Sequence, residues 1–233
     1  MNKKISIIPI VAILLSGCNV NVDASEPPKG YDSSITLQAE VSTLITDCTQ
    51  IAEYRLMLEY PELESSISYP DPETSVIEFN RPENWDERSL ETLCRHGELT
   101  FRKGTETATD SDGQTIPSGE ILLQNTDIAT AWAGMMSTDL GPTYVVNVKM
   151  SDIGRDKFAA DTEELAGTDT PISIWYDNDM ISAPTVNTAI TNGEAIISGD
   201  FTVESANELA ASINSGTLPC GLTITDFKIG EDK

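Results

Sequence analysis

After residue 31 the apolar residues occur in short segments, and their spacing limits the folds that the chain can adopt. Some segments place an apolar residue at every third or fourth position, as in a helix that packs on one side. Others alternate apolar and polar residues, as in a strand. Both periods occur throughout, so the sequence predicts an α+β fold. No later segment reaches the roughly 20 apolar residues that a membrane-spanning helix needs.

The first third of this body is predicted to contain two helices and three strands. A 3.6-residue apolar period predicts a long helix that ends at Pro61, and Gly97 is the expected end of a second, short helix. In chain order the predicted elements are a helix over residues 35–60, strands over 66–69 and 75–79, a short helix through Cys94, and a strand over 98–102.

The rest of the body is predicted to interleave further helices and strands. Asp127, Ser151 and Thr202 are residue types that cap helix N-termini. The predicted helices cover residues 127–136, 151–165 and 202–215, and the predicted strands cover 121–123, 144–150, 172–176, 195–198 and 222–229. Residues 105–119 are rich in Thr, Asp, Ser and Gly and are predicted to form a loop.

The N-terminus has the pattern of a secretory signal. Two lysines precede an apolar stretch, residues 5–15, that is too short to span a bilayer comfortably. The stretch ends in Leu-Ser-Gly-Cys, which resembles the bacterial lipobox, where the cysteine receives a diacylglycerol and becomes the first residue after cleavage. We expect residues 1–17 to be a lipoprotein signal peptide and Cys18 to be lipidated. An ordinary signal with an incidental cysteine is the alternative.

Residues 18–34 are polar and include two prolines and a glycine, a composition typical of a tether. Two acyl chains on Cys18 would attach the protein stably, because a single chain binds a bilayer only marginally. We therefore expect a lipid-anchored protein of the cell membrane whose folded body faces the extracytoplasmic side.

Acidic side chains strongly outnumber basic ones, with 38 Asp and Glu against 14 Lys and Arg and a formal net charge of −24. Binding to nucleic acid needs a basic surface, so we expect no nucleic-acid partner. The excess charge is interpreted as an aid to solubility.

The sequence lacks the residue patterns of common catalytic and metal sites. His96 is its one histidine, and no nucleophile elbow, phosphate-binding loop or CxxC motif occurs. Residues 110–113 match part of a calcium loop but lack its downstream glutamate, so a polar loop is expected. Trp132 and Trp175 are expected in the core rather than as sugar platforms. We predict no metal site, no cofactor and no enzymatic activity, and assign no ligand-binding residues; a hydrolase of envelope polymers is the least favoured alternative.

Residues 174–219 resemble the first extracytoplasmic domain of SecD, the accessory subunit of the bacterial Sec export machinery. The family pattern is present as Ile-Ser-Ala-Pro at 181–184, Ile-Ser-Gly at 197–199, Phe-Thr at 201–202, and Ser-Gly followed by Leu-Pro at 215–219. Upstream, Leu-Thr-Phe-Arg at 99–102 resembles a strand of the family, whereas the first third matches only in the order of its elements.

The resemblance implies a ferredoxin-like base subdomain with an inserted α+β head subdomain. The base would comprise residues 35–102 and 220–229, and the head would comprise residues 103–219. The two crossings between them would act as a hinge, with Gly104 and Pro219 as the hinge residues.

Three cysteines remain after Cys18, and an extracytoplasmic setting permits a disulfide. Cys48 and Cys94 each lie on the apolar side of a predicted helix, and the resemblance implies that these helices pack side by side. Cys48 and Cys94 are therefore the expected disulfide pair. Three free thiols, including Cys220, are the alternative.

The resemblance also implies a non-catalytic binding module that assists Sec-dependent protein export. Its expected partners are unfolded or emerging secreted polypeptides and subunits of the Sec translocase. SecD proteins continue into membrane helices that carry transport residues, and this sequence ends at Lys233, so we do not expect a complete motor subunit. The alternative is a repurposed SecD fold that binds one specific folded envelope protein and has no export role.

Overall fold

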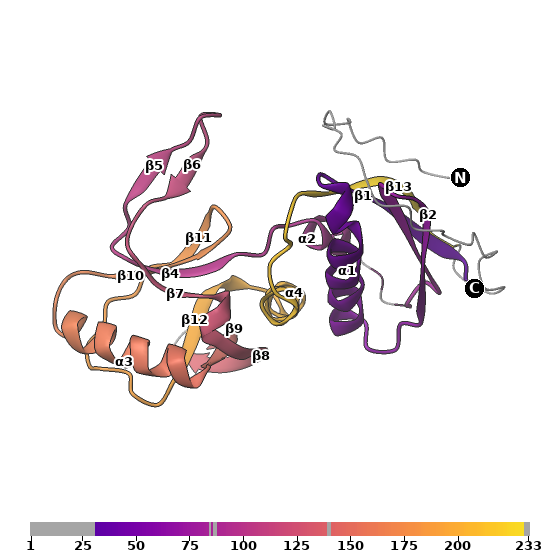
Figure 1. The fold of residues 1–233 in the computed structure, drawn as a ribbon. Helices are drawn as coiled ribbons and strands as arrows, with labels where there is room; N and C mark the ends of the chain where they lie inside the picture. Colours follow the sequence, from indigo (N-terminus) through magenta and orange to yellow (C-terminus); the bar gives the residue numbers. More distant parts are fainter. Residues whose placement is uncertain (1–30, 84, 86–87, 139–140, 231–233) are drawn as a thin grey trace. The chain divides into compact units, whose positions relative to one another are not determined.

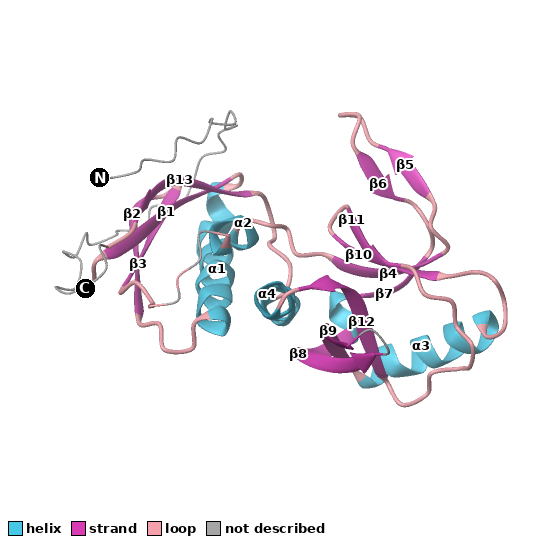
Figure 2. Cartoon of the chain, turned by 180° about the vertical axis from the view of Figure 1, so that it is seen from behind, coloured by secondary structure: helices cyan, strands magenta, loops and turns pink. Residues whose placement is uncertain are grey.

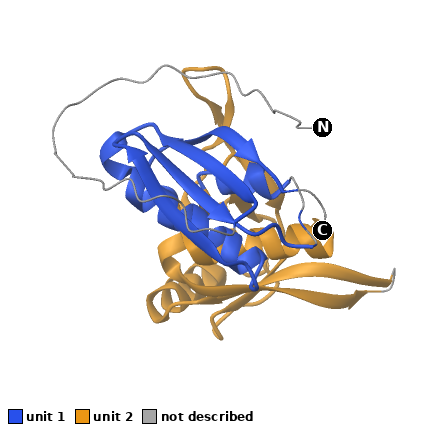
Figure 3. Ribbon diagram, turned by 90° about the vertical axis from the view of Figure 1, so that its right-hand side faces the viewer, with its two compact units in different colours: residues 1–96, 218–233 blue, residues 97–217 orange. Residues whose placement is uncertain are grey.

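A computed structural model describes residues 31–83, 85, 88–138 and 141–230 (Figure 1). The chain divides into two compact units, shown in two colours in Figure 3. Unit 1 comprises residues up to His96 together with those from Leu218 onward, and unit 2 comprises Gly97–Thr217. The predicted signal peptide, Cys18 and most of the predicted tether lie outside the described residues.

Unit 1 has the strand and helix order of a ferredoxin-like fold, β-α-β-β-α-β. Its strands form one antiparallel sheet in the order β13-β1-β3-β2, and Figure 2 shows both helices on the same side of it. The elements are β1 (Ser33–Ala39), the short 3₁₀-helix η1 (Ser42–Leu44), α1 (Ile45–Glu59), β2 (Ser65–Asp71), β3 (Thr74–Phe79), α2 (Ser89–Leu93) and β13 (Leu222–Lys228).

The predicted helix over residues 35–60 is wrong in its first part, because β1 occupies Ser33–Ala39. Alternate residues of β1 are buried, and the apolar ones among them, Ile35, Leu37 and Ala39, belong to the core of unit 1. The apolar residues of β1 happen to fit the 3.6-residue period that continues into α1. Between the strand and the helix, the chain turns through η1, and α1 begins at Ile45.

Arg55 is a charged residue buried in unit 1, with 4% of its surface exposed. Its guanidinium group lies against the C-terminal end of α2, where helix carbonyls lack partners within the helix. It donates hydrogen bonds to the carbonyl oxygens of Thr92 (3.1 Å), Leu93 (3.0 Å), Arg95 (2.6 Å) and His96 (3.4 Å). Arg55 thus attaches α1 to the end of α2 and to the last residues of unit 1 before the chain enters unit 2.

Unit 2 contains a four-stranded sheet in the order β11-β10-β4-β7, a three-stranded sheet in the order β12-β9-β8, and the hairpin β5-β6. Its elements are β4 (Leu99–Lys103), β5 (Thr107–Thr109), β6 (Thr115–Pro117), β7 (Ile121–Gln124), η2 (Asn125–Asp127), β8 (Ile128–Thr138), β9 (Gly141–Met150), α3 (Asp152–Leu165), β10 (Ile172–Tyr176), β11 (Asp179–Ser182), β12 (Glu194–Phe201) and α4 (Val203–Ser215).

One apolar core joins the two larger sheets of unit 2 to α3 and α4. Phe101 of β4 meets Phe158 of α3 edge to face, with ring centroids 5.8 Å apart. Leu209 and Ile213 of α4 are buried in the same core as Val146 of β9.

Two predictions for unit 2 are wrong. Residues 128–138 form the strand β8 rather than a helix, because they pair in a long antiparallel register with β9, whose valines and tyrosine favour a strand. The helix-forming Ala and Met residues of β8 yield to this pairing. The predicted loop over residues 105–119 contains the β5-β6 hairpin.

The boundary between the units falls at His96/Gly97 and Thr217/Leu218, rather than after residues 102 and 219. Residues 99–102 are predicted to belong to the base, but β4 pairs with β10 and β7 of unit 2. A strand with partners on both sides in one sheet belongs to that sheet.

We predict that Arg55→Met destabilises unit 1 by about 3 kcal/mol, because methionine keeps the buried length but removes the donor to the carbonyls of Leu93 and Arg95. Chemical denaturation of the wild type, of Arg55→Met and of a control variant measures the change in the free energy of unfolding. Lys228→Met is the control, since Lys228 is largely exposed and its ion pair with Asp226 is 3.4 Å long; its effect should stay below about 1 kcal/mol. Equal effects of the two substitutions would contradict the role given to Arg55.

Candidate functional site

A groove of about 730 Å³ lies within unit 2, beside the irregular segment of residues 184–192. Buried side chains of β4, β10 and α3 line it, together with residues of the sheet β12-β9-β8. The residues on which the following argument rests are Trp132, Asn147 and Ile196, together with the 184–192 segment; this set is called the groove below.

Trp132, Asn147 and Ile196 form a row across the three-stranded sheet. Asn147 of β9 is paired with Trp132 of β8 on one side and with Ile196 of β12 on the other, so the three side chains share one face. Trp132 is 46% exposed and Ile196 is 50% exposed. The row therefore presents two apolar surfaces on either side of an amide.

Gly134 makes room for that amide. A Cβ at this position would lie 2.4 Å from Nδ2 of Asn147, closer than atoms can approach. Within the described part of the chain, the Asn147 side chain has no recorded hydrogen-bond partner. Its donor and acceptor groups are therefore available to a ligand that carries backbone-like amides.

The 184–192 segment has no long regular element, but hydrogen bonds fix its course. The backbone N–H of Ile190 donates to Oγ1 of Thr162 on α3 (2.9 Å), and Thr162 is itself fully buried. The other backbone hydrogen bonds at and next to the segment are Ile172 N–H to Pro184 O (2.8 Å), Gly167 N–H to Val186 O (2.9 Å) and Met150 N–H to Gly193 O (2.9 Å). The wall of the groove is thus held in place by α3, β9 and β10.

The edge strand β8 is partly blocked as a site for strand addition. Asn214 of α4 accepts a hydrogen bond from the Ala131 N–H (2.8 Å) and donates one to the Ala131 carbonyl (2.7 Å). These two groups are the ones that an added strand would use. At this point a ligand must contact side chains rather than extend the sheet.

The acidic residues of two turns accept backbone hydrogen bonds and so have structural roles. Asp110 accepts hydrogen bonds from the backbone N–H groups of Asp112 and Gln114 in the β5-β6 turn. Asp177, at φ 54°, accepts from the N–H groups of Gly97 and Glu98. Among the residues that the structure describes, no three His, Cys, Asp or Glu side chains cluster as metal ligands. No helix in this part of the chain has the length and apolarity to cross a membrane.

The structure places the sequence-predicted hinge residues in different settings. Gly104 is buried in unit 2 at φ +77°, and its N–H donates to the Pro171 carbonyl at 2.8 Å. Pro219 is exposed and directly follows Leu218, whose N–H donates to the His96 carbonyl at 2.8 Å. The hydrogen bond between Leu218 and His96 therefore joins the two crossings at the edge of unit 1, whereas Gly104 belongs to unit 2.

The structure does not bring together the predicted disulfide pair, Cys48 and Cys94. Cys48 lies against Cys220, and all three sulfurs are free thiols. Cys94 instead faces β13, where it accepts a hydrogen bond from the backbone of Ile224, and burial raises its pKa to about 11. The expectation assumed that both cysteines point toward the contact between the helices, and Cys94 does not.

Sequence reasoning missed the groove because it placed Trp132 in the core. Trp175 is indeed buried, at 4% exposed, whereas Trp132 is half exposed. Once residues 128–138 are read as a strand, alternation places Trp132 opposite the buried Ala131, and this is the signal that would have found it.

We predict that Thr162→Val lowers the stability of unit 2 by about 1–2 kcal/mol, because the part-buried Ile190 N–H loses its acceptor. Hydrogen exchange at the Ile190 amide should accelerate along with it. Thr162→Ser keeps the hydroxyl and is the matched control, expected to preserve the protection of that amide. Unchanged exchange in the valine variant would show that Thr162 does not hold the segment.

The family model of the SecDF P1 head subdomain matches residues 102–220 of this chain. The protein translocase subunit SecD of Rickettsia bellii is 38% identical over 117 residues, which cover 50% of this chain and 22% of that protein. SecD of Synechocystis sp. is 38% identical over 91 residues, which cover 37% of this chain and 19% of that protein. The chain thus spans about a fifth of the length of these curated relatives.

Two solved structures share the fold. SecDF in a super-membrane-facing form has a TM-score of 0.66 and 24% identity, with 84% of this chain and 30% of that chain covered. A chain from a study of SecDF as a membrane component that enhances protein export has a TM-score of 0.62 and 23% identity, with 82% and 97% covered.

Proposed function

The chain belongs to the SecDF P1 head family and contains a SecD-type first extracytoplasmic domain, and from this we propose that it is a non-catalytic module that assists protein export. In this proposal unit 2 contacts unfolded or emerging secreted polypeptides, or subunits of the Sec translocase. The observation that carries the proposal is the groove in the family-matched segment, with its exposed apolar pair and open amide.

The chemistry of the groove suits an extended polypeptide. An unfolded chain exposes apolar side chains beside unpaired backbone amides, and Trp132, Ile196 and Asn147 offer a matching partner to each. The half-buried apolar surface is small, so binding by this row is expected to be weak and reversible. Such contacts suit a polypeptide that must be released after it crosses the membrane.

We further propose that a lipid on Cys18 attaches the folded units to the membrane. The support is the Leu-Ser-Gly-Cys pattern after a short apolar stretch, followed by a polar tether. This attachment would keep the groove near the exit of the translocase.

Crosslinking in cells tests the export role. A photoreactive residue in place of Asn192, which lines the groove, should capture several secreted polypeptides or translocase subunits. The same residue in place of Asp112, in the turn of the β5-β6 hairpin, is the control and should capture few of them. A single folded envelope protein as the one product at Asn192 would overturn the proposal and support the repurposed fold.

We predict that Trp132→Ala and Ile196→Ala each weaken binding of a permanently unfolded model polypeptide by about tenfold, which corresponds to about 1.4 kcal/mol. Fluorescence anisotropy with a labelled polypeptide measures the affinity, and thermal unfolding checks the fold. Ile153→Ala removes a side chain that is 74% exposed on α3 outside the groove, and should change nothing. Equal binding by all variants would remove the groove from the proposal.

We predict that Cys18→Ser moves the protein from the membrane fraction to the soluble extracytoplasmic fraction, because the serine hydroxyl cannot form the thioether to lipid. Incorporation of a labelled fatty acid should be lost in the same variant. The lipid anchor would be refuted if the Cys18→Ser variant stayed in the membrane fraction and the wild type carried no fatty acid. That result would not bear on the groove.

A further inference from the structure

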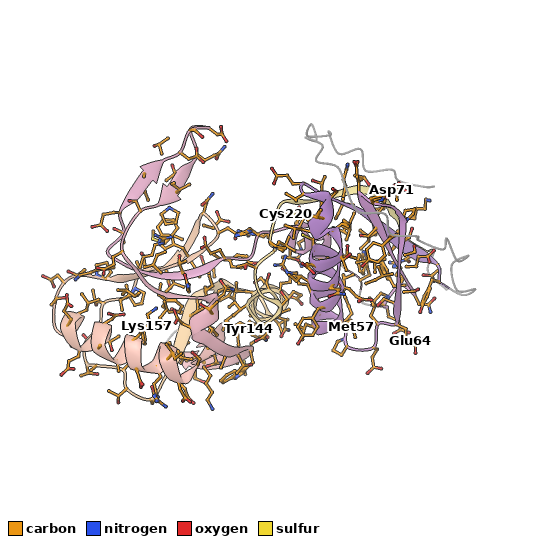
Figure 4. All side chains as sticks on the ribbon, viewed as in Figure 1. Met57, Glu64, Asp71, Tyr144, Lys157 and Cys220 are labelled. Carbon is orange, nitrogen blue, oxygen red and sulfur yellow. The ribbon has the colours of Figure 1, made fainter. Side chains whose placement is uncertain are left out.

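Two cysteine sulfurs that are far apart in the sequence meet inside unit 1. Sγ of Cys48 lies 3.5 Å from Sγ of Cys220, across a separation of 172 residues. Cys48 belongs to the first turn of α1, and Cys220 lies two residues before β13. Figure 4 labels Cys220 beside the start of α1.

We propose that Cys48 and Cys220 form a structural disulfide in the mature protein. A disulfide has a sulfur–sulfur bond of about 2.05 Å, so the two atoms must approach by roughly 1.5 Å, which small side-chain rotations can supply. The proposed function takes this SecD-type domain to be extracytoplasmic, and extracytoplasmic proteins work where thiols are oxidised. The inference rests on the extracytoplasmic location in the proposed function and on the geometry of unit 1, and it is independent of what the groove in unit 2 binds.

The oxidant is a disulfide carried by a thiol–disulfide exchange protein or by oxidised glutathione. Cys220 is partly exposed whereas Cys48 is fully buried, so Cys220 attacks the oxidant first. This attack forms a mixed disulfide between Cys220 and one sulfur of the oxidant, and the other sulfur of the oxidant leaves as a thiol. Cys48 then loses its proton and attacks Sγ of Cys220 in the mixed disulfide, and the second thiol leaves. Two cysteine thiols are thereby oxidised, one oxidant disulfide is reduced, and the proton from each cysteine ends on a departing thiol or in water.

The environment of Cys48 makes the second step slow in the folded protein. Burial, together with its contact to Cys220, raises the pKa of the Cys48 thiol to about 12. Only a small fraction is a thiolate at neutral pH, and the thiolate is the attacking species. The same burial shields the finished disulfide from reductants.

Cys94 stands apart from this pair. Its sulfur faces the backbone of Ile224 on β13, while Cys48 contacts both the sulfur and, at 3.9 Å, the carbonyl oxygen of Cys220. The geometry therefore assigns one pair and leaves Cys94 as a free thiol.

The bond would join the two separate pieces of unit 1. Cys48 lies in the piece before unit 2 and Cys220 in the piece after it. β13 is an edge strand held by β1 alone, so a covalent link just ahead of it keeps the C-terminal piece in place. Closing so long a loop restricts the unfolded chain strongly, and the oxidised protein should melt on the order of 10 °C above the reduced protein.

Peptide mapping of the full protein tests the assignment. The protein is equilibrated with oxidised and reduced glutathione, its free thiols are blocked by alkylation, and it is digested without reductant. The expected result is one linked pair of peptides that contain Cys48 and Cys220, with Cys94 alkylated. A link through Cys94 would overturn the proposal. So would alkylation of all of Cys48, Cys94 and Cys220 when oxidised glutathione is in large excess.

Matched variants separate the bond from general effects of cysteine loss. Cys94→Ala should keep the linked peptides and the drop in melting temperature on addition of reductant. Cys48→Ala and Cys220→Ala should each abolish that drop, and the Cys220 variant retains the buried residue of α1 in case the Cys48 variant does not fold. A reductant effect that persists in the Cys220 variant would also count against the proposal.

Discussion

The antiparallel pairing of β1 with β13 is the constraint on which the rest of unit 1 depends. Leu37 of β1 is paired with Ile224 of β13, and both side chains are buried in one core. These residues come from opposite ends of the chain, so this sheet closes only after the whole of unit 2 has been enclosed between them. Unit 2 is continuous, and its neighbouring strands are joined by much shorter connections. The entropic cost of closing a loop grows slowly with its length, so the pairing of β1 with β13 costs somewhat more than the shorter closures within unit 2. Two contacts support this closure. Arg55 binds His96, where the chain leaves unit 1, and Cys48 contacts Cys220, where the chain has returned to it.

Local signals in the sequence predicted the elements that local interactions determine. Ser151 and Thr202 were expected to cap helices, and their side chains accept hydrogen bonds from the N–H groups of Gly154 and Ser205. The elements that the sequence analysis misses are strands whose partners it does not reveal, some distant and some adjacent. β1 pairs with β3 and with the distant β13, but its spacing also fits the start of α1. β8 pairs with the next strand, β9, but its Ala and Met residues favour a helix. In both cases a partner strand supplies the energy that overrides local preference, and a single sequence does not show which strands will pair.

The groove and the cysteine contact likewise depend on which strands pair. Trp132 becomes an exposed neighbour of Ile196 only through the register that each strand shares with Asn147 of β9. The resemblance to SecD pointed to residues 181–184 and 197–199, which flank the wall of the groove, but it did not extend to Trp132. The expected disulfide pair is Cys48 with Cys94, and no predicted element brings Cys220 to Cys48. Its proximity to Cys48 follows from the ferredoxin-like order, which returns the last strand to the side of the first.

Under the proposed function, the two units separate the two properties that an export module needs. The groove lies wholly in unit 2, with apolar surface that an unfolded polypeptide can use, while the closure that keeps the domain folded lies wholly in unit 1. A surface that binds unfolded chains is exposed to the same hydrophobic contacts that drive aggregation, and the net charge of −24 opposes association between copies of the protein. Asn214 acts in the same direction by occupying the backbone groups of Ala131 on the edge of β8. The protein can therefore present Trp132 and Ile196 to a partner while its sheet edge and its charge limit self-association.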